Sequence, residues 1–220
     1  MILNQQYNLL YIINPRVAST SICKQLGFPV ENRPFIPVDD IKIFYGEDWY
    51  NINKFTFVRN PYTRIVSDYF QTYFGTERAN RLDPLEFDDW FDSLNNAPRL
   101  VDEPLVFGGK MTLHKPPQVS FINEDINYIG RYEKLSEHWS EMLNLFGLGA
   151  EKATHWGFKE NDNYVKELFN NLPTFRASAA IYYTVEKIEE TLLPKTIKKI
   201  NLLYKDDFDN PYFRYPKIEI

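Results

Sequence analysis

The sequence predicts an α/β protein, a single domain with a central, mainly parallel sheet flanked by helices. Two continuous apolar runs each end in an Asn-Pro pair, at 14–15 and 60–61. Such runs are typical of strands covered on both faces, and amphipathic patterns with helical spacing follow them. The 220 residues, 44% of them apolar, suffice for one core and fall short of the roughly 250 at which chains usually divide.

Three segments are predicted as strands. Asn8–Ile13 and Lys54–Val58 are the two apolar runs, and Ile126–Gly130 is a third candidate. After the first strand the chain turns at Asn14-Pro15 into a short helix that ends near Gly27. The ends of the first two strands are therefore the places to look for a ligand, because open α/β sheets bind ligands beyond the carboxyl ends of their strands.

The clearest helix begins after the second strand and is expected over Tyr62–Phe74. Asn60 is a suitable N-cap and Pro61 a suitable first helical residue. One apolar stripe runs along it, through Ile65, Tyr69 and Tyr73. Further helices are predicted at about Pro84–Asn95, Leu135–Phe146, Asn161–Asn170 and Val185–Tyr204. The segment Asn95–Pro117, rich in Pro, Gly and Asn, is expected to be a long loop.

Charge and cysteine content exclude several classes of function. The chain has 25 Lys+Arg against 30 Asp+Glu, a net charge of −5, which argues against a nucleic-acid partner. The single Cys allows no internal disulfide, and no Cys/His cluster has zinc-ligand spacing, so no metal site is predicted. No signal peptide and no membrane-spanning run is recognisable, and a cytoplasmic protein is therefore expected.

The turn after the first strand is a candidate anion site. Arg16 supplies a cation, and the consecutive hydroxyls of Ser19, Thr20 and Ser21 lie where a helix begins. A strand-to-helix turn directs backbone N–H groups and the positive helix end toward one point, which suits a phosphate or sulfate. The same residues equally fit an ordinary helix cap beside a solvated Arg. The Gly-x4-Gly-Lys-Ser/Thr pattern of ATP and GTP hydrolases is absent.

The end of the second strand is a second candidate. Arg59 closes the strand, and Ser67 follows two turns into the next helix, with Arg64 on the same face. A guanidinium can bind a phosphate with two parallel hydrogen bonds while a hydroxyl donates a third. The alternative is that Arg59 pairs with a carboxylate and Ser67 is a surface residue. Two such sites at one sheet edge indicate a ligand with two separated anionic groups.

Both motifs resemble those of the carbohydrate sulfotransferase family that uses 3'-phosphoadenosine 5'-phosphosulfate. Asn14–Ser21 is similar to the family's Pro-Lys-x-x-x-Ser/Thr-Ser loop, which holds the 5'-phosphosulfate, with Arg16 where Lys is usual. Phe57–Tyr69 is similar to the family's 3'-phosphate motif, with Arg59 and Ser67 at its phosphate-binding positions. Weaker similarities lie at Leu113–Ile122, Tyr128–Leu135 and Tyr182–Phe208.

The resemblance implies a P-loop-like sulfotransferase fold over residues 1–220, with 75–117 as the variable acceptor-binding region. It implies in-line transfer of a sulfuryl group to a carbohydrate hydroxyl, without a metal. Arg16 would stabilise charge on the transferring group. The donor would bind at Arg16, Val17, Ala18, Ser19, Thr20, Ser21, Arg59 and Ser67. Two alternatives remain open, a nucleotide-dependent kinase and a relative that binds nucleotide or glycan without catalysis.

A hydroxyl acceptor benefits from a general base, and His is the side chain best suited to this role near neutral pH. His114 is the first choice, because it lies in a segment that resembles a family motif. His138 falls in a predicted helix and is expected at the surface, while His155 and Glu133 are further candidates. The acidic excess around the variable region favours a neutral or mildly anionic sugar over a highly sulfated one.

Overall fold

A computed structural model describes residues 2–27, 35–72, 82–96, 116–148 and 184–220. These residues form two compact units. The first holds the described residues up to Arg59 together with 118–148, and the second holds the described residues from Asn60 to 117 together with 184–220. In the described part of the chain, no helix combines the length and the apolar character needed to cross a bilayer.

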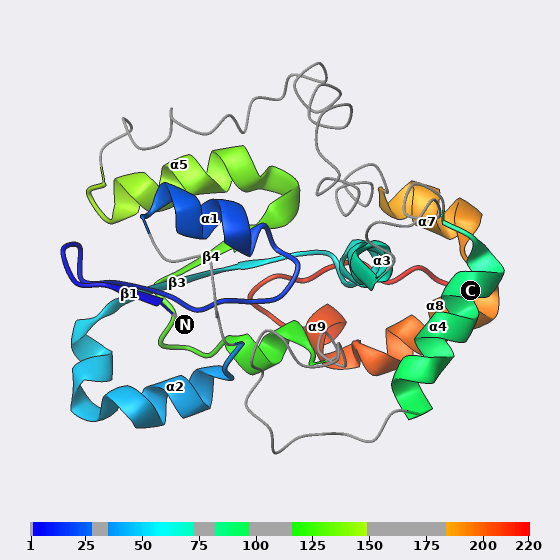
Figure 1. The fold of residues 1–220 in the computed structure, drawn as a ribbon, viewed down its shortest axis with the longest axis horizontal. Helices are drawn as coiled ribbons and strands as arrows, with labels where there is room; N and C mark the ends of the chain where they lie inside the picture. The colour runs from blue at the N-terminus through cyan, green and yellow to red at the C-terminus, as the bar shows by residue number, and fades with distance from the viewer. Residues whose placement is uncertain (1, 28–34, 73–81, 97–115, 149–183) are drawn as a thin grey trace. The chain divides into compact units, whose positions relative to one another are not determined.

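The first unit contains a four-stranded sheet in the order β1-β2-β3-β4 (Figure 1). β2 (Leu9–Tyr11), β3 (Asn53–Val58) and β4 (Tyr128–Arg131) are parallel to one another, as predicted. β1 (Ile2–Asn4) pairs antiparallel with β2, and the sequence analysis did not predict it. A strand of three residues is too short to show a periodic pattern, so only its pairing with β2 reveals it.

Helices cover both faces of this sheet, which explains the continuous apolar runs. Figure 1 shows α1 (Ser19–Gln25) and α5 (Leu135–Leu145) on one side and α2 (Val38–Tyr45) on the other. Successive strand residues point to opposite faces. Leu9 and Tyr11 therefore pack toward α1 and α5, while Leu10 and Ile12 belong to the core on the α2 side.

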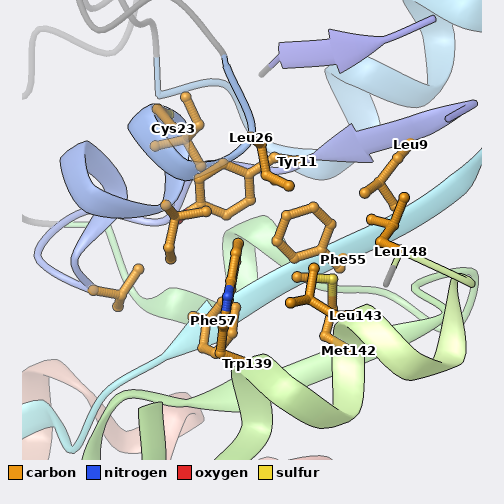
Figure 2. Packing of buried hydrophobic residues seen from close by; sticks show 13 residues of the cluster. Leu9, Tyr11, Cys23, Leu26, Phe55, Phe57, Trp139, Met142, Leu143 and Leu148 are labelled. Carbon is orange, nitrogen blue, oxygen red and sulfur yellow. The ribbon is translucent and has the colours of Figure 1, made fainter. Parts of the chain in front are cut away.

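Aromatic rings fill the core between the sheet and α5. Tyr11 stacks on Phe55 of the neighbouring strand, with ring centroids 4.8 Å apart. Phe57 packs against Trp139 of α5 with centroids 6.3 Å apart, and all four residues are visible in Figure 2. Each of these side chains is at most 1% exposed. Burial of large apolar side chains such as these is the main stabilising contribution to a small sheet.

The regular secondary structure described in the second unit is helical. α3 (Pro61–Thr72) begins where the sequence predicts, because the Tyr62 N–H donates to Asn60 Oδ1 at 3.0 Å and Pro61 needs no acceptor. The remaining helices are α4 (Pro84–Asn96), α7 (Val185–Thr191), α8 (Pro194–Leu203) and α9 (Lys205–Asp209).

Several predicted boundaries need correction. The single helix expected over Val185–Tyr204 is two helices, because Pro194 has no N–H to continue the first and instead starts the second. The loop expected from Asn95 begins later, since Asn95 belongs to α4. Most of that loop, and the helix expected at Asn161–Asn170, lie outside the described residues. The 3₁₀ segments η1 (Gly46–Asn51), η3 (Gln118–Phe121) and η4 (Tyr132–Lys134) were not predicted.

Candidate functional site

The loop that joins β2 to α1 has an unusual backbone. Arg16 and Ala18 have φ values of 65° and 62°, in the left-handed region that L-residues seldom occupy. The loop is closed by the Ser19 hydroxyl, which donates to the Asn14 carbonyl oxygen at 2.9 Å. Ala18 offers no capping side chain to α1, although its carbonyl oxygen accepts the first helical hydrogen bond, from Ile22 N at 3.1 Å.

The side chains of this loop differ in what they can offer a ligand. Val17 is fully buried in the core beside α5, so only its backbone is available. Arg16 and Ser19 are half-buried, while Thr20 and Ser21 are exposed. The first N–H groups of an α-helix have no acceptor within the helix. Loop and helix start therefore present backbone N–H groups, hydroxyls and one guanidinium, all hydrogen-bond donors.

Arg59 lies immediately beyond the end of β3 and contacts this loop. Its Nη1 donates to the Arg16 carbonyl oxygen at 3.2 Å, and its Cζ lies 4.1 Å from the centre of the Tyr132 ring. The side chain is 3% exposed. The two arginines singled out from the sequence, 43 residues apart along the chain, thus belong to neighbouring segments at one sheet edge.

Gln118, the first residue of η3, contacts both the β2–α1 loop and the residue that follows β3. Its side-chain amide accepts a hydrogen bond from Arg59 N at 2.8 Å and donates to Arg59 O at 2.7 Å. Asn14 Nδ2 donates to the same Gln118 oxygen at 3.3 Å and to Phe57 O at 3.2 Å. In the sequence this Gln is recognisable only as part of the segment Leu113–Ile122 that is similar to a family motif, and no role is predicted for it.

Ser67 belongs to α3 in the second unit and is 3% exposed, so its interpretation as a surface residue is wrong. Arg64, one turn earlier, has a clear structural role. Its Nη2 donates to the Pro116 carbonyl oxygen at 3.0 Å, and its guanidinium lies over the Tyr204 ring at 4.8 Å and 3.7 Å from an Asp207 oxygen. Burial raises the pKa of the Tyr204 hydroxyl, which therefore stays neutral at physiological pH.

Of the histidines, His138 is described, whereas His114 and His155 lie outside the described residues. His138 is half-buried rather than fully at the surface, and its Nδ1 accepts a hydrogen bond from Arg131 N at 2.7 Å. The imidazole thereby connects α5 to the end of β4. Glu133, the other candidate base, is exposed in η4.

Among the described residues, Glu137, His138 and Glu141 bring possible metal-ligand atoms within 4.8 Å of one another. Because His138 Nδ1 accepts a hydrogen bond, the neutral ring carries its proton on Nε2 and has no nitrogen lone pair left for a metal. Both carboxylates are exposed, and such acidic groups commonly occur without an ion. This cluster is therefore a poor metal site.

The described sheet is mainly parallel and leads into a hydroxyl-rich turn and an arginine, in an α/β fold. The model of the sulfotransferase family matches residues 1–216, so the chain belongs to that family. The protein is accordingly a transferase of the sulfotransferase type. No curated protein and no solved structure matches the chain.

Proposed function

We propose that this protein transfers a sulfuryl group from 3'-phosphoadenosine 5'-phosphosulfate to a hydroxyl of a carbohydrate acceptor. Members of the family generally use this donor. The observation that carries the proposal is the hydrogen bond from Arg59 Nη1 to Arg16 O, which joins the two motifs that resemble donor-binding segments. A donor with anionic groups at both ends of its sugar needs two such segments near each other.

The chemistry of the loop fits a phosphosulfate. Residues 14–21 include no Asp or Glu, and they offer backbone N–H groups, the hydroxyls of Thr20 and Ser21, and the Arg16 guanidinium, while the Ser19 hydroxyl closes the loop. A carboxylate in this loop would repel the ligand, whereas these donors attract it. In the proposal, Arg16 and the backbone of 17–21 hold the 5'-phosphosulfate, and Arg59 and Ser67 hold the 3'-phosphate.

The donor supplies the sulfuryl group and leaves as adenosine 3',5'-bisphosphate. The protein contributes alignment and charge stabilisation, which are the main requirements of in-line group transfer. In the proposal, Arg16 stabilises the negative charge that develops near the bridging oxygen. A guanidinium presents a planar fork with a permanent charge where an ammonium would present a compact one. Arg16 therefore donates hydrogen bonds to more than one oxygen of the transferring group rather than to a single oxygen.

The acceptor hydroxyl must lose a proton as it attacks sulfur. In the proposal, His114 takes this proton, and residues 75–117 of the single sulfotransferase domain bind the carbohydrate. The side chain of His138 is engaged with Arg131 N, and Glu133 lies exposed in η4. These contacts support His114 over His138 as the base. Loss of transfer with unchanged donor affinity in His114→Ala would support this role, and full activity would remove it.

Calorimetry with adenosine 3',5'-bisphosphate and with ATP tests the donor assignment. We expect the bisphosphate to bind more tightly, and Arg59→Ala to weaken it by at least about tenfold, since a charge-assisted contact contributes about 1.5–3 kcal/mol. Arg214→Ala, which removes an exposed guanidinium in the second unit, is the matched control and should change little. Tight binding of ATP but not of the bisphosphate would overturn the donor assignment.

A further inference from the structure

The backbone of Arg59 lies just past the end of the strand ladder. The last pair between β3 and β4 is Val58 with Arg131, so Arg59 lies one residue beyond that ladder. Gln118 takes this place with a side chain instead of a strand. Its amide makes both a 2.8 Å and a 2.7 Å hydrogen bond to the Arg59 backbone, one with the N–H and one with the carbonyl.

This pairing is fully shielded from water. Gln118 and Asn14 are 0% exposed and Arg59 is 3% exposed. A buried polar group that loses its partner costs more free energy than the hydrogen bond itself contributes. The amide of Gln118 therefore restricts the Arg59 backbone to one conformation more strongly than a solvated contact would.

The same amide also contacts Asn14, near the start of the neighbouring loop. Asn14 Nδ2 donates to the Gln118 oxygen at 3.3 Å and to Phe57 O at 3.2 Å. Asn14 in turn accepts the Ser19 hydroxyl at its carbonyl oxygen. One side chain from η3 thus connects the end of β3 with the start of the β2–α1 loop.

The guanidinium of Arg59 is held at its far end by Arg16 O and the Tyr132 ring, and its backbone is held by Gln118. We propose that Gln118 is a positioning residue that orients Arg59 for the 3'-phosphate of the donor without touching the donor itself. This inference rests on the proposed function, because it needs Arg59 to bind that phosphate.

The test compares affinities for adenosine 3',5'-bisphosphate and for adenosine 5'-phosphate, which lacks the 3'-phosphate. Gln118→Met keeps the length of the side chain and removes its amide. We expect it to weaken the bisphosphate about tenfold, because Arg59 is no longer held in one orientation, and adenosine 5'-phosphate less than about twofold. In an Arg59→Ala background the same substitution should have no further effect on the bisphosphate.

Thr56→Val is the matched control. The Thr56 hydroxyl in β3 is also fully buried, and it donates to Ile12 O at 2.8 Å rather than to Arg59. The control should lower the melting temperature and leave the preference for the bisphosphate unchanged. Equal losses for both nucleotides in Gln118→Met, or a loss that persists without Arg59, would show a merely structural role and overturn the inference.

Gln118→Glu keeps the inference testable if Gln118→Met does not fold. Its carboxylate still accepts from Arg59 N but cannot donate to Arg59 O until it is protonated. Relative to the wild type at each pH, the preference for the bisphosphate should therefore recover as the pH falls. A variant that keeps the wild-type preference at every pH overturns the inference alone. A wild type that does not prefer the bisphosphate overturns the proposed function as well.

Discussion

Arg16 and Ala18, both among the residues proposed to bind the donor, adopt positive φ values without being glycine. A left-handed conformation costs an L-residue about 1–2 kcal/mol, so the surroundings must impose it. The Ser19–Asn14 hydrogen bond and the Arg59 contact to Arg16 O supply this constraint. The turn is therefore held in this conformation by contacts within the protein.

Substitution at Ala18 measures this strain. Ala18→Val should lower the free energy of unfolding by about 1–3 kcal/mol, because a β-branched side chain is least tolerant of φ near +60°. Ala18→Gly is the matched control and should leave stability unchanged or raise it by up to about 1 kcal/mol. Urea unfolding followed by tryptophan fluorescence gives both values. A Val variant as stable as the Gly variant would contradict the strained turn.

The sequence predicts which residues form this turn but not how they are held. Arg16 and Arg59 are visible in short motifs, because strand, turn and helix chemistry is local there. The contact of Gln118 with Arg59 spans 59 positions and its contact with Asn14 spans 104, and both depend on the pairing of the strands. A spacing pattern within one segment carries no information about such a contact.

Where the strands β3 and β4 pair, a ring of β3 packs so closely on the backbone of β4 that only glycine fits there. Gly130 pairs with Phe57, and a Cβ added to it would lie 2.3 Å from Phe57 Cε1. The ring cannot move away easily, because it packs against Trp139 and is fully buried. Gly130 therefore allows an aromatic residue to fill the core over the central strand.

Gly130→Ala should destabilise the protein by roughly 1–3 kcal/mol through overpacking. Combining it with Phe57→Leu should recover part of the loss, because a smaller side chain gives the new methyl group room. Gly27→Ala is the control, since nothing lies within 4 Å of its added Cβ and only its φ of +70° is strained. Thermal melts of the four variants report the coupling, and strictly additive effects would contradict the contact.

Helices α4 and α8 are joined by a buried carboxylate. Asp88 is 4% exposed and accepts hydrogen bonds from Thr196 Oγ1 at 2.7 Å and Lys199 Nζ at 3.4 Å, with Lys195 Nζ at 2.5 Å. Burial alone would raise the pKa of Asp88, but these three partners outweigh it and hold the pKa below its usual value of 3.8. Its ionised form therefore stabilises the folded state.

The sign of the pH dependence follows from this lowered pKa. Since the unfolded chain binds the Asp88 proton more tightly, stability is present above about pH 5 and is lost as the pH falls through the folded-state pKa below 3.8. Asp88→Asn should lower stability at pH 7 by about 1–2 kcal/mol and flatten its decline below pH 5. Urea unfolding measured from pH 7 to below pH 5 checks this pH dependence, and Asp206→Asn, at an exposed position, is the control. An unchanged acid decline would contradict the assignment.

Local chemistry predicted some element boundaries and missed others. The start of α3 was predictable because Asn60 and Pro61 satisfy the helix end themselves. Pro194 has no N–H, which indicates a helix break before it, but the apolar pattern continues across this position and favours one helix. β1 owes its existence to pairing with β2, and short segments of this kind depend on tertiary contacts.

The net charge of the whole molecule is negative, whereas the local charge of the β2–α1 loop is positive. The chain carries a net charge of −5, yet residues 14–21 contain no acid. Average charge governs solubility and non-specific binding, while recognition of a dianionic ligand depends on a few donors placed together. Membership of the sulfotransferase family over residues 1–216 agrees with this distribution.

Transfer of radiolabelled sulfate from 3'-phosphoadenosine 5'-phosphosulfate to a panel of carbohydrate acceptors tests the proposed function directly. The proposed function predicts label on at least one glycan with the wild type, and its loss in Arg59→Ala at donor concentrations that saturate the wild type. Label that reaches no acceptor despite tight binding of adenosine 3',5'-bisphosphate would contradict catalysis. Equal transfer by Arg59→Ala and the wild type would contradict the assigned donor site.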